Sequence, residues 1–448
     1  MKINLKNKIM LAVLAGGMLC ANGAMAAGCW YGASDNATTW NGAADVFDIP
    51  ETACTTGADL TLDGAGTYGG IAFADVDKFI GGIDMGDGNV TQNLITVTGG
   101  VFAANRFIAC GNTYLGDVTN NSIIILDGNF GENNTFEAGF SNVGTVSSNA
   151  VTISDGDFGA SNKFYGGFNY SGDVTGNTVT ISGGTFGNSN KFYGGFRYEG
   201  DVTGNTVTIS GGDFGANVEI YGGMIEDGYT GDAINNTVEI SGGDFSDGYK
   251  LYGGWCCLGT GSGNTLNLKT KMSGKASHVA LFQIMNFTLP SDIANGDTML
   301  KTQLLEVSDS DNTATVNVDA ANGVSLKKGD VITLIDSDET YEHYAAGDIL
   351  GGAAEFYSEA DTGEDKNGDG DQYDLVITLL EDYSSGGGGD DQQKAPVEGI
   401  AAGVAMVNQS ADLASGEGMQ NLLKNTGNFD KTETNYNIDT FGAVTGSR

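Results

Sequence analysis

Proline, basic residues and histidine are scarce in this sequence. Its 448 residues include only 3 prolines, and 20 Lys and Arg stand against 57 Asp and Glu. The formal net charge of −37 repels phosphate backbones, so nucleic acid is excluded as the expected partner. Because His278 and His343 are the only histidines and no Cys-x-x-Cys pair occurs, a zinc site of ordinary spacing is excluded as well.

Long hydrophobic runs are also missing beyond the N-terminus. The first residues combine Lys2, Lys6 and Lys8 with a short apolar stretch over 9–19 and then the small-residue triplet Ala-Met-Ala. This order is typical of a secretory signal peptide, which we assign to 1–26. No later apolar run reaches the roughly 18 residues of a transmembrane helix. We therefore expect a chain exported through the inner membrane to the periplasm, the cell surface (outer membrane) or the medium.

Cysteines are few, and an odd number of them follows the signal peptide. An exported chain meets an oxidising compartment, so we predict a disulfide between Cys29 and Cys54 that closes the N-terminal segment. The odd count leaves at least one thiol without an intramolecular partner. The adjacent Cys256 and Cys257 fit either a strained vicinal disulfide or two thiols.

Glycine, in contrast, is abundant, and its 72 residues without a collagen-like period indicate turns at short intervals. They belong to an internal repeat in which an Asn opens a short strand. Successive Asn are 28 residues apart, except for one step of 31 whose extra residues fall around 227–230. All but the last are followed nine residues later by Phe. The repeated residues are Asn93, Asn121, Asn149, Asn177, Asn205, Asn236 and Asn264.

Each repeat has the parts of one solenoid coil. Val179 and Ile181 alternate with polar residues as in a half-buried strand, and Gly pairs turn the chain. One such unit cannot bury its apolar face alone, whereas stacked units can. We therefore predict an all-β fold, a right-handed parallel β-helix of about seven 28-residue coils over 89–268. We expect an N-terminal cap with irregular first coils over 27–88, and an all-β continuation and C-terminal cap over 269–383.

Stacking places equivalent residues directly above one another, about 4.8 Å apart. The Phe column becomes an interior aromatic ladder, and the Asn column a ladder of amides that donate to the next coil. The alternative for the Asn column is that Asn only tolerates a turn. In a charged column, Glu219 stands between lysines and relieves the repulsion of like charges; its other members are Lys163, Lys191 and Lys250.

A tyrosine column is the candidate ligand-binding surface. It has the opposite parity to Phe164 and Phe168, so we expect it to face water. An exposed aromatic row flanked by acidic turns suits glycan or protein. The alternative is that these rings only shield the strands beneath them. The column consists of Tyr165, Tyr193, Tyr221 and Tyr252.

One acidic loop has the spacing of a calcium site. Asp365, Asn367, Asp369 and Asp371 alternate with other residues as in the first half of an acidic calcium loop. Val376 takes the place of the closing bidentate Glu. The loop is therefore either a calcium site or a solvated acidic turn.

The end of the chain predicts a linker and a helix. The segment 384–394 is Gly-rich and acidic, and 395–425 carries apolar residues at helical spacing. The order of these parts resembles the bacterial autotransporters of type V secretion. The resemblance rests on the Asn-x-Val-x-Ile-Ser-Gly-Gly repeats and on four further segments. Segments 287–295 and 329–335 resemble passenger sequence, 401–414 resembles the pore helix, and 441–446 resembles the entry into the barrel.

The resemblance implies a passenger that crosses the outer membrane with a β-barrel translocator as partner. Only 442–448 follows Phe441, whereas eight barrel strands of about 9–11 residues need more than about 70. We therefore expect 426–448 to be the start of a barrel domain that is absent from this chain.

Three functions compete for this architecture. The first is a non-enzymatic adhesin that binds host glycan or protein along a repetitive face. The second is a polysaccharide lyase or hydrolase, since solenoids also carry such sites. Against it, the lysines lie in a regular ladder, and Asp173, Asp201 and Asp232 stack at equivalent turns. The third is a structural spacer at the cell surface.

Overall fold

The computed structural model describes residues 52–53, 56–57, 59–63, 67–68, 71–72, 78–84, 87–256, 259–307, 313–340, 343–363, 365–370, 373–385, 436–438 and 444–446. In this part of the chain the only helices are α2 (Glu359–Thr362) and the 3-10 turn η2 (Leu350–Gly352). Neither is long or apolar enough to cross a membrane. The chain divides into two compact units, and 24–387 contains the solenoid. The other unit contributes the antiparallel pair β42 (Tyr436–Ile438) and β43 (Val444–Gly446).

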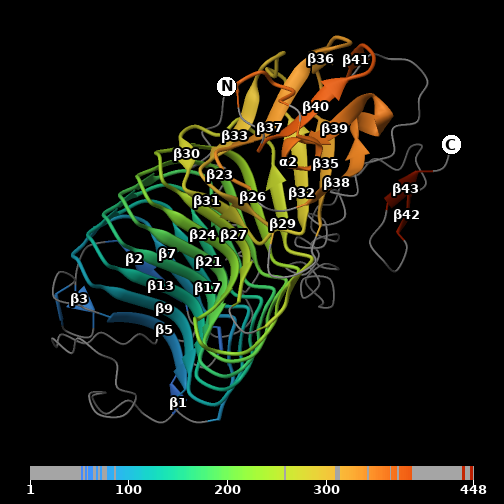
Figure 1. Cartoon of the computed structure of the whole chain (residues 1–448). Helices are drawn as coiled ribbons and strands as arrows, with labels where there is room; N and C mark the ends of the chain where they lie inside the picture. The colour runs from blue at the N-terminus through green and yellow to red at the C-terminus, as the bar shows by residue number, and fades with distance from the viewer. Residues whose placement is uncertain are drawn as a thin grey trace. The chain divides into compact units, whose positions relative to one another are not determined.

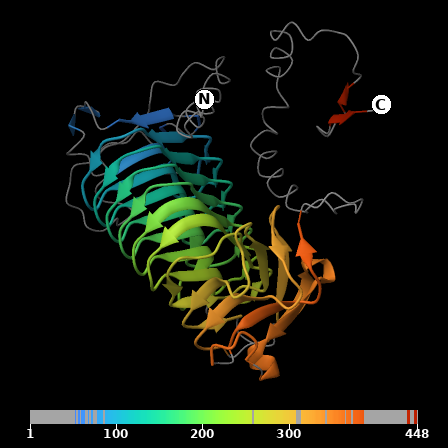
Figure 2. The same cartoon turned by 90° about the horizontal axis from the view of Figure 1, so that it is seen from above.

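The repeats form a parallel β-solenoid, as the sequence predicted (Figures 1 and 2). Its strands pair in register, so that Val179 lies opposite Val151 on one side and Val207 on the other. The solenoid has about nine turns. The predicted seven are those with an Asn in the repeat, and strands before and after them extend the same sheets.

Three long sheets, here called A, B and C, make up the solenoid. Sheet A contains β1 (Thr52–Ala53), β5 (Lys78–Asp84), β9 (Phe107–Thr113), β13 (Thr135–Ser141), β17 (Lys163–Asn169), β21 (Lys191–Arg197), β24 (Glu219–Ile225), β27 (Lys250–Trp255), β31 (His278–Ala280) and β34 (Leu305–Glu306). Sheet B contains β6 (Val90–Thr91), β10 (Val118–Thr119), β14 (Val146–Ser147), β18 (Val174–Thr175), β22 (Val202–Thr203), β25 (Ala233–Ile234) and β28 (Gly261–Ser262). Sheet C contains β2 (Asp59–Leu62), β7 (Leu94–Val97), β11 (Ser122–Ile125), β15 (Ala150–Ile153), β19 (Thr178–Ile181), β23 (Thr206–Phe214), β26 (Thr237–Phe245), β29 (Thr265–Leu268), β32 (Ile284–Leu289), β35 (Ala314–Ala320) and β38 (Tyr344–Ile349), with β8 (Val101–Phe102), β12 (Asn129–Phe130), β16 (Asp157–Phe158) and β20 (Thr185–Phe186) beside them.

A further sheet closes the C-terminal end of the solenoid. Its strand β40 pairs antiparallel with both β37 and β39, which ends the parallel stacking. We call it the cap sheet; it contains β30 (Lys275–Ala276), β33 (Thr298–Thr302), β37 (Val331–Ser337), β40 (Leu375–Leu379) and β39 (Ala354–Ser358). Two short antiparallel pairs complete the strands, β3 (Thr67–Tyr68) with β4 (Ile71–Ala72) and β36 (Ser325–Leu326) with β41 (Tyr383–Ser384).

The Phe column is the predicted interior aromatic ladder. Phe158 and Phe186 are buried, and their ring centroids lie 4.8 Å apart in parallel planes. A second Phe column on sheet A meets the first edge to face, with Phe164 lying 5.3 Å from Phe158. Such pairs add about 0.5–1.5 kcal/mol each to the burial of their area. The interior is therefore a continuous aromatic stack along the solenoid axis.

The Asn column is the predicted ladder of buried amides. From Asn93 to Asn264, each Nδ2 donates to the Oδ1 of the next Asn at 2.8 to 3.1 Å. The same Oδ1 accepts the preceding Asn's backbone N–H, and in Asn177 the Nδ2 also donates to the carbonyl of Val146 at 3.0 Å. The left-handed turn conformation belongs to the residue before each Asn, as at Ser148 with φ 57°. The alternative in which Asn only tolerates a turn is therefore wrong.

A second amide ladder was not predicted. The backbone N–H groups of Arg106, Asn134 and Asn162 donate to the side chains of Asn134, Asn162 and Asn190 at 2.7, 2.7 and 2.9 Å. These three amides are buried at the corner between sheets C and A. The residues before them are again left-handed, with φ 57° at Asn133 and 61° at Ser161 and Ser189. Two of the solenoid's corners are thus closed by buried side-chain amides.

Glycine is required where sheet A passes the ladder formed by Asn93 to Asn264. A Cβ on Gly167 would lie 2.5 Å from Nδ2 of Asn177, a separation that real Cβ atoms do not show. The equivalent glycine meets the ladder Asn in neighbouring coils, as Gly139 does with Asn149. The interior at this corner is therefore filled by amides, and sheet A can only pass it with a bare backbone.

Several predicted parts lie outside the described residues. These are the signal peptide 1–26, both Cys29 and Cys54 of the predicted disulfide, and the linker helix 395–425. The predictions for them stand untested.

Replacing Asn177 by Ala should lower the free energy of unfolding by about 3 kcal/mol, because it leaves buried backbone and amide partners in both adjacent coils without a hydrogen bond. The midpoint of urea unfolding, followed by circular dichroism, measures this loss. Asn129→Ala is the matched control, since Asn129 is exposed. Equal midpoints for the two variants would contradict a stabilising role for the ladder.

Candidate functional site

The tyrosine column lies on the outer face of sheet A, as its parity predicted, but the expectation that it faces water is wrong. Tyr165, Tyr193, Tyr221 and Tyr252 are only 6, 4, 6 and 4% exposed. Consecutive rings stack with centroids 4.8 to 5.0 Å apart, so each ring covers its neighbours. The column is therefore a second, external aromatic stack, separate from the interior core.

The cover over this column comes from Phe168, which was expected in the interior, and from Phe196. Phe168 packs against Tyr165 at 5.3 Å, and Phe196 against Tyr193 at 5.3 Å. Side chains of this strand do not alternate strictly between the inner and outer faces of sheet A. Gly167 must face Asn177 on the inside, and Phe168 after it therefore points outward. The prediction that Phe168 shares the side of Phe164 is thus wrong.

The tyrosines of the column are buried, and two of their hydroxyl groups are hydrogen-bonded rather than presented to solvent. Burial raises the pKa of Tyr165, Tyr193, Tyr221 and Tyr252 well above the ordinary value. The Tyr221 hydroxyl donates to Glu219 at 3.0 Å, and that of Tyr252 lies 3.2 Å from Nδ1 of His278. This supports the alternative in which the column shields the strands.

Exposed tyrosines instead lie on the turns from sheet A to sheet B, just beyond the ends of the same strands, beside two half-buried aromatics: Tyr198 on a turn and Trp255 at the end of β27. Tyr170 stacks on Tyr198 at 4.8 Å, and Tyr229 meets Tyr198 edge to face at 5.5 Å. Tyr170 is 40% and Tyr229 43% exposed. The indole N–H of Trp255 donates to the carboxylate of Asp227 at 2.8 Å. We call Tyr170, Tyr198, Tyr229 and Trp255 the aromatic stripe.

The stripe was missed because it follows the repeat only in part. Tyr170 and Tyr198 are one repeat apart, but Tyr229 lies in the insertion around 227–230. A column of identical residues in consecutive repeats is the signal that the sequence offers, and two tyrosines are too few to form one. The insertion itself was the available signal, since it marks the only coil whose turn differs in length within the ladder.

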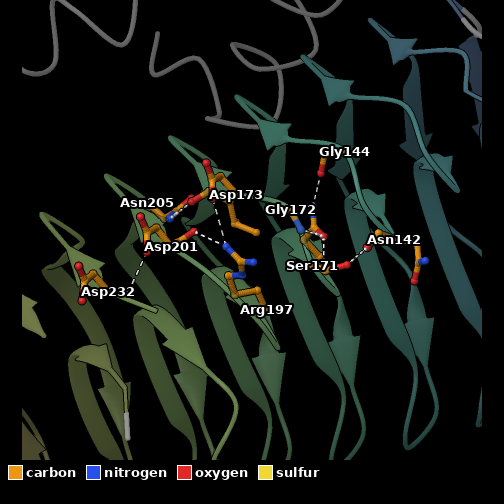
Figure 3. A network of polar contacts seen from close by, with 11 residues as sticks. Asn142, Gly144, Ser171, Gly172, Asp173, Arg197, Asp201, Asn205 and Asp232 are labelled. Atoms are coloured by element: carbon orange, nitrogen blue, oxygen red, sulfur yellow. Dashed lines mark hydrogen bonds and ion pairs between the residues drawn. The ribbon is translucent and has the colours of Figure 1, made fainter. Parts of the chain in front are cut away.

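A buried Arg lies at the same turns (Figure 3). Arg197 is 1% exposed, and its Nη1 lies 3.3 Å from the Asp173 carboxylate and 3.2 Å from the carbonyl of Asp201. Burial lowers the pKa of Arg197, and the Asp173 carboxylate acts against that change. In the two preceding coils Ser141 and Asn169 occupy the same position and bond to turn carbonyls. Arg197 is thus an anchor for the turn, out of reach of a ligand.

The stacked aspartates of the turns are also structural. Asp201 accepts the backbone N–H of Asp232 at 3.0 Å (Figure 3). Asp232 accepts both the N–H and the hydroxyl of Thr260 at 2.8 Å, and these bonds lower the pKa of Asp232. Each carboxylate therefore fastens one turn to the next coil, in place of the paired carboxylates that a hydrolase needs.

Glu219 pairs with the lysines on either side of it in the charged column, as predicted. Glu219 accepts Lys191 at 2.6 Å and Lys250 at 3.1 Å. Burial raises the pKa of Glu219, but the hydrogen bonds from both lysines outweigh it and lower the pKa overall. Two of the three lysines are thus ion-paired.

In the acidic loop the structure describes Asp365, Asn367 and Asp369, while Asp371 lies outside the described residues. The Asp365 carboxylate accepts the N–H groups of Gly368 and Gly370 at 2.5 and 3.1 Å. Asp369 comes close to Asp336 and Asp374, with one carboxylate oxygen of each within 4.8 Å of the others. The loop therefore gathers acidic groups from strands that the motif did not include.

Glu137 generates a prediction about pH. It precedes Tyr165 in the outer column and is 4% exposed. Burial raises the pKa of Glu137 to about 8 from 4.5, although Lys163 acts in the opposite direction. Between about pH 4.5 and 8 the folded state therefore keeps a proton that the unfolded chain releases. The free energy of unfolding then falls as pH rises through this range, by up to ~1.4 kcal/mol per pH unit.

Glu137→Gln should remove this loss. Its urea midpoint should match that of the wild type at about pH 4 and exceed it at about pH 9. Glu132→Gln, at an exposed position of the same coil, is the control and should show no such crossover. A difference from wild type that stays constant with pH would contradict the assignment.

No protein-family model, curated protein or solved structure matches this chain. The β-solenoid is therefore identified from its own register and hydrogen bonds, and the resemblance to autotransporter passengers stays a prediction.

Proposed function

We propose that this chain is an exported, non-enzymatic binding protein of adhesin type that holds a glycan or protein partner on the aromatic stripe. The observation that carries the proposal is the exposure of Tyr170 and Tyr229, whose rings both contact Tyr198. Large amphipathic rings on a rigid scaffold supply contact area at a low cost in conformational entropy.

The acidic residues around the aromatic stripe limit the chemical classes of partner that it can bind. Burial raises the pKa of the Tyr198 hydroxyl, and Tyr170 and the negative charge of Glu226 add to this. Asp227 holds the Trp255 indole, and the Asp173 side chain is 65% exposed. Such a surface favours partners that present hydroxyl or cationic groups, since carboxylates accept hydrogen bonds from both.

The lyase or hydrolase alternative is less well supported by the side chains of the repeats. A lyase needs a base that can reach a substrate, whereas Lys191 and Lys250 are bound to Glu219 and Arg197 is buried. The turn aspartates hold backbone N–H groups. A structural spacer explains the solenoid but gives no reason for an exposed aromatic row at the insertion.

The location of the protein is part of the same proposal. The N-terminus has the order of a signal peptide, and the solenoid is of the kind that the autotransporter resemblance implies. We propose presentation at the cell surface or release into the medium, with a β-barrel translocator as the transport partner.

The proposal is tested by binding of the labelled mature chain to a glycan array and to cultured host cells. Tyr198→Ser and Tyr229→Ser should each weaken binding about tenfold, because stacked aromatics are typical binding hot spots. Tyr114→Ser is the matched control, since Tyr114 and Tyr229 are both 43% exposed. Wild-type binding by all three variants would place the binding surface elsewhere, and shortened glycan products would favour the enzyme.

A further inference from the structure

The outer face of sheet C carries a regular array of threonines. In β19 the residues that face the interior are buried, so Thr178 and Thr180 point outward. The register pairs Thr178 with Thr206 in the next coil, and it pairs Thr180 with Thr208. The neighbouring coils on either side extend both columns. We call the following residues the threonine face: Thr152, Thr178, Thr180, Thr206, Thr208 and Thr237.

The hydroxyl groups of the threonine face form no hydrogen bond with any described residue of the chain. The serines that come next along the same strands behave differently. Ser182 donates to the carbonyl of Ile153 at 3.3 Å, and Ser210 donates in the same way one coil later. The threonine side chains are half-buried, so each meets solvent with a hydroxyl and a methyl group.

Charge is missing from this face. The strands β7, β11, β15 and β19 contain no charged residue, and neither does 206–210 in β23, although the chain has a formal net charge of −37. Charge returns only one coil later, where Glu239 pairs with Lys269 at 3.2 Å. A charged ligand would lose its hydration on the threonine face and gain no ion pair. The face therefore suits an uncharged ligand.

The array repeats in two directions. Neighbouring coils are about 4.8 Å apart, and alternate residues along a strand are about 6.6 Å apart. The amide ladder holds this register from coil to coil. A single hydroxyl gains little from a ligand, because the new hydrogen bond replaces one with water. A ligand that repeats in the same way can form all of its bonds together once its ordering cost is met, so the array favours a crystalline partner.

A second copy of the chain is a poor occupant of this face. The seven strands from β7 to β29 in sheet C span about 29 Å, and four residues of a strand span about 13 Å. The face therefore offers roughly 400 Å², about half of the 800 Å² that each partner buries in a stable complex.

We infer that the threonine face binds ice by holding the ordered water of a crystal surface. A hydroxyl group has one donor and two acceptor lone pairs, so it can take the place of a water molecule in a hydrogen-bonded lattice. The methyl groups between the hydroxyls restrict the orientations of the water that covers them. Ordered water that bridges to a rigid surface is nearly as favourable as a direct contact.

This inference goes beyond the proposed function and does not depend on it. The threonine face lies on sheet C, whereas the aromatic stripe lies at the end of sheet A. Tyr198→Ser should therefore keep ice binding, and a variant of the threonine face should keep binding to the glycan array or to host cells.

The experiment is to grow single ice crystals in solutions of the full mature chain and to measure the gap between the melting and freezing temperatures. We expect faceted crystals, and a gap that widens with protein concentration. An unrelated acidic protein at the same concentration is the control, and it should give round crystals without a gap. The same result for the mature chain at its highest soluble concentration would overturn the inference.

Variants locate the ice-binding surface. Thr180→Tyr and Thr208→Tyr should each reduce the temperature gap several-fold, because a ring that stands out of the array prevents close contact with a flat crystal. Tyrosine is favoured in strands, so both variants should keep the circular dichroism and urea midpoint of the wild type. Thr175→Tyr, at an exposed position of β18 in sheet B, is the matched control and should act as wild type. A wild-type gap in both face variants would contradict the assignment.

A crystalline neutral polysaccharide is the competing partner. The threonine face has no aromatic ring, the group that would supply most of the contact area to a sugar. Sedimentation with microcrystalline cellulose tests this reading. Retention on cellulose that Thr180→Tyr abolishes, without any effect of the wild type on ice, would overturn the inference and assign the face to polysaccharide.

Discussion

The buried amide ladder is the interaction on which the rest of the solenoid depends. An Asn side chain removed from water must keep its hydrogen bonds, and these Asn find them only when the next coil lies in register above. An insertion that moved the next Asn out of register would break two bonds at once. The single insertion therefore falls in an outer turn around 227–230, and the bonds from Asn205 to Asn236 stay at 3.0 and 3.1 Å.

The same interior requirement shapes the outer surface. The amide at the corner admits only a bare backbone at Gly167, and the chain beyond it then turns Phe168 outward. Phe168 and its equivalents cover the tyrosine column, so the aromatic surface available to a partner shifts to the turns beyond. The position of the stripe is thus a consequence of how the interior is filled, in combination with an insertion that adds Tyr229.

The sequence predicted the features that repeat by identity and missed those that depend on neighbours. The Phe and Asn ladders follow from identical residues one repeat apart, and stacking alone determines their contacts. The burial of Tyr165 depends on a change of parity at Gly167, which alternation cannot show. The second ladder has only three Asn, and the carboxylates around Asp369 come from separate strands. Contacts between different parts of the chain are set by the folded topology, which a single sequence does not display.

The ladder also has a direction. Every Asn donates toward the C-terminal end, so each coil leaves two donors that only the following coil can satisfy. In the last position the backbone N–H of Asn264 finds Oε1 of Gln283 at 3.0 Å, only 19 residues further on, where the repeat has ended. A glutamine, longer than Asn by one methylene group, reaches across that shortened step. Gln283 therefore ends the asparagine ladder without ending the solenoid, because sheet C continues past it through β32, β35 and β38.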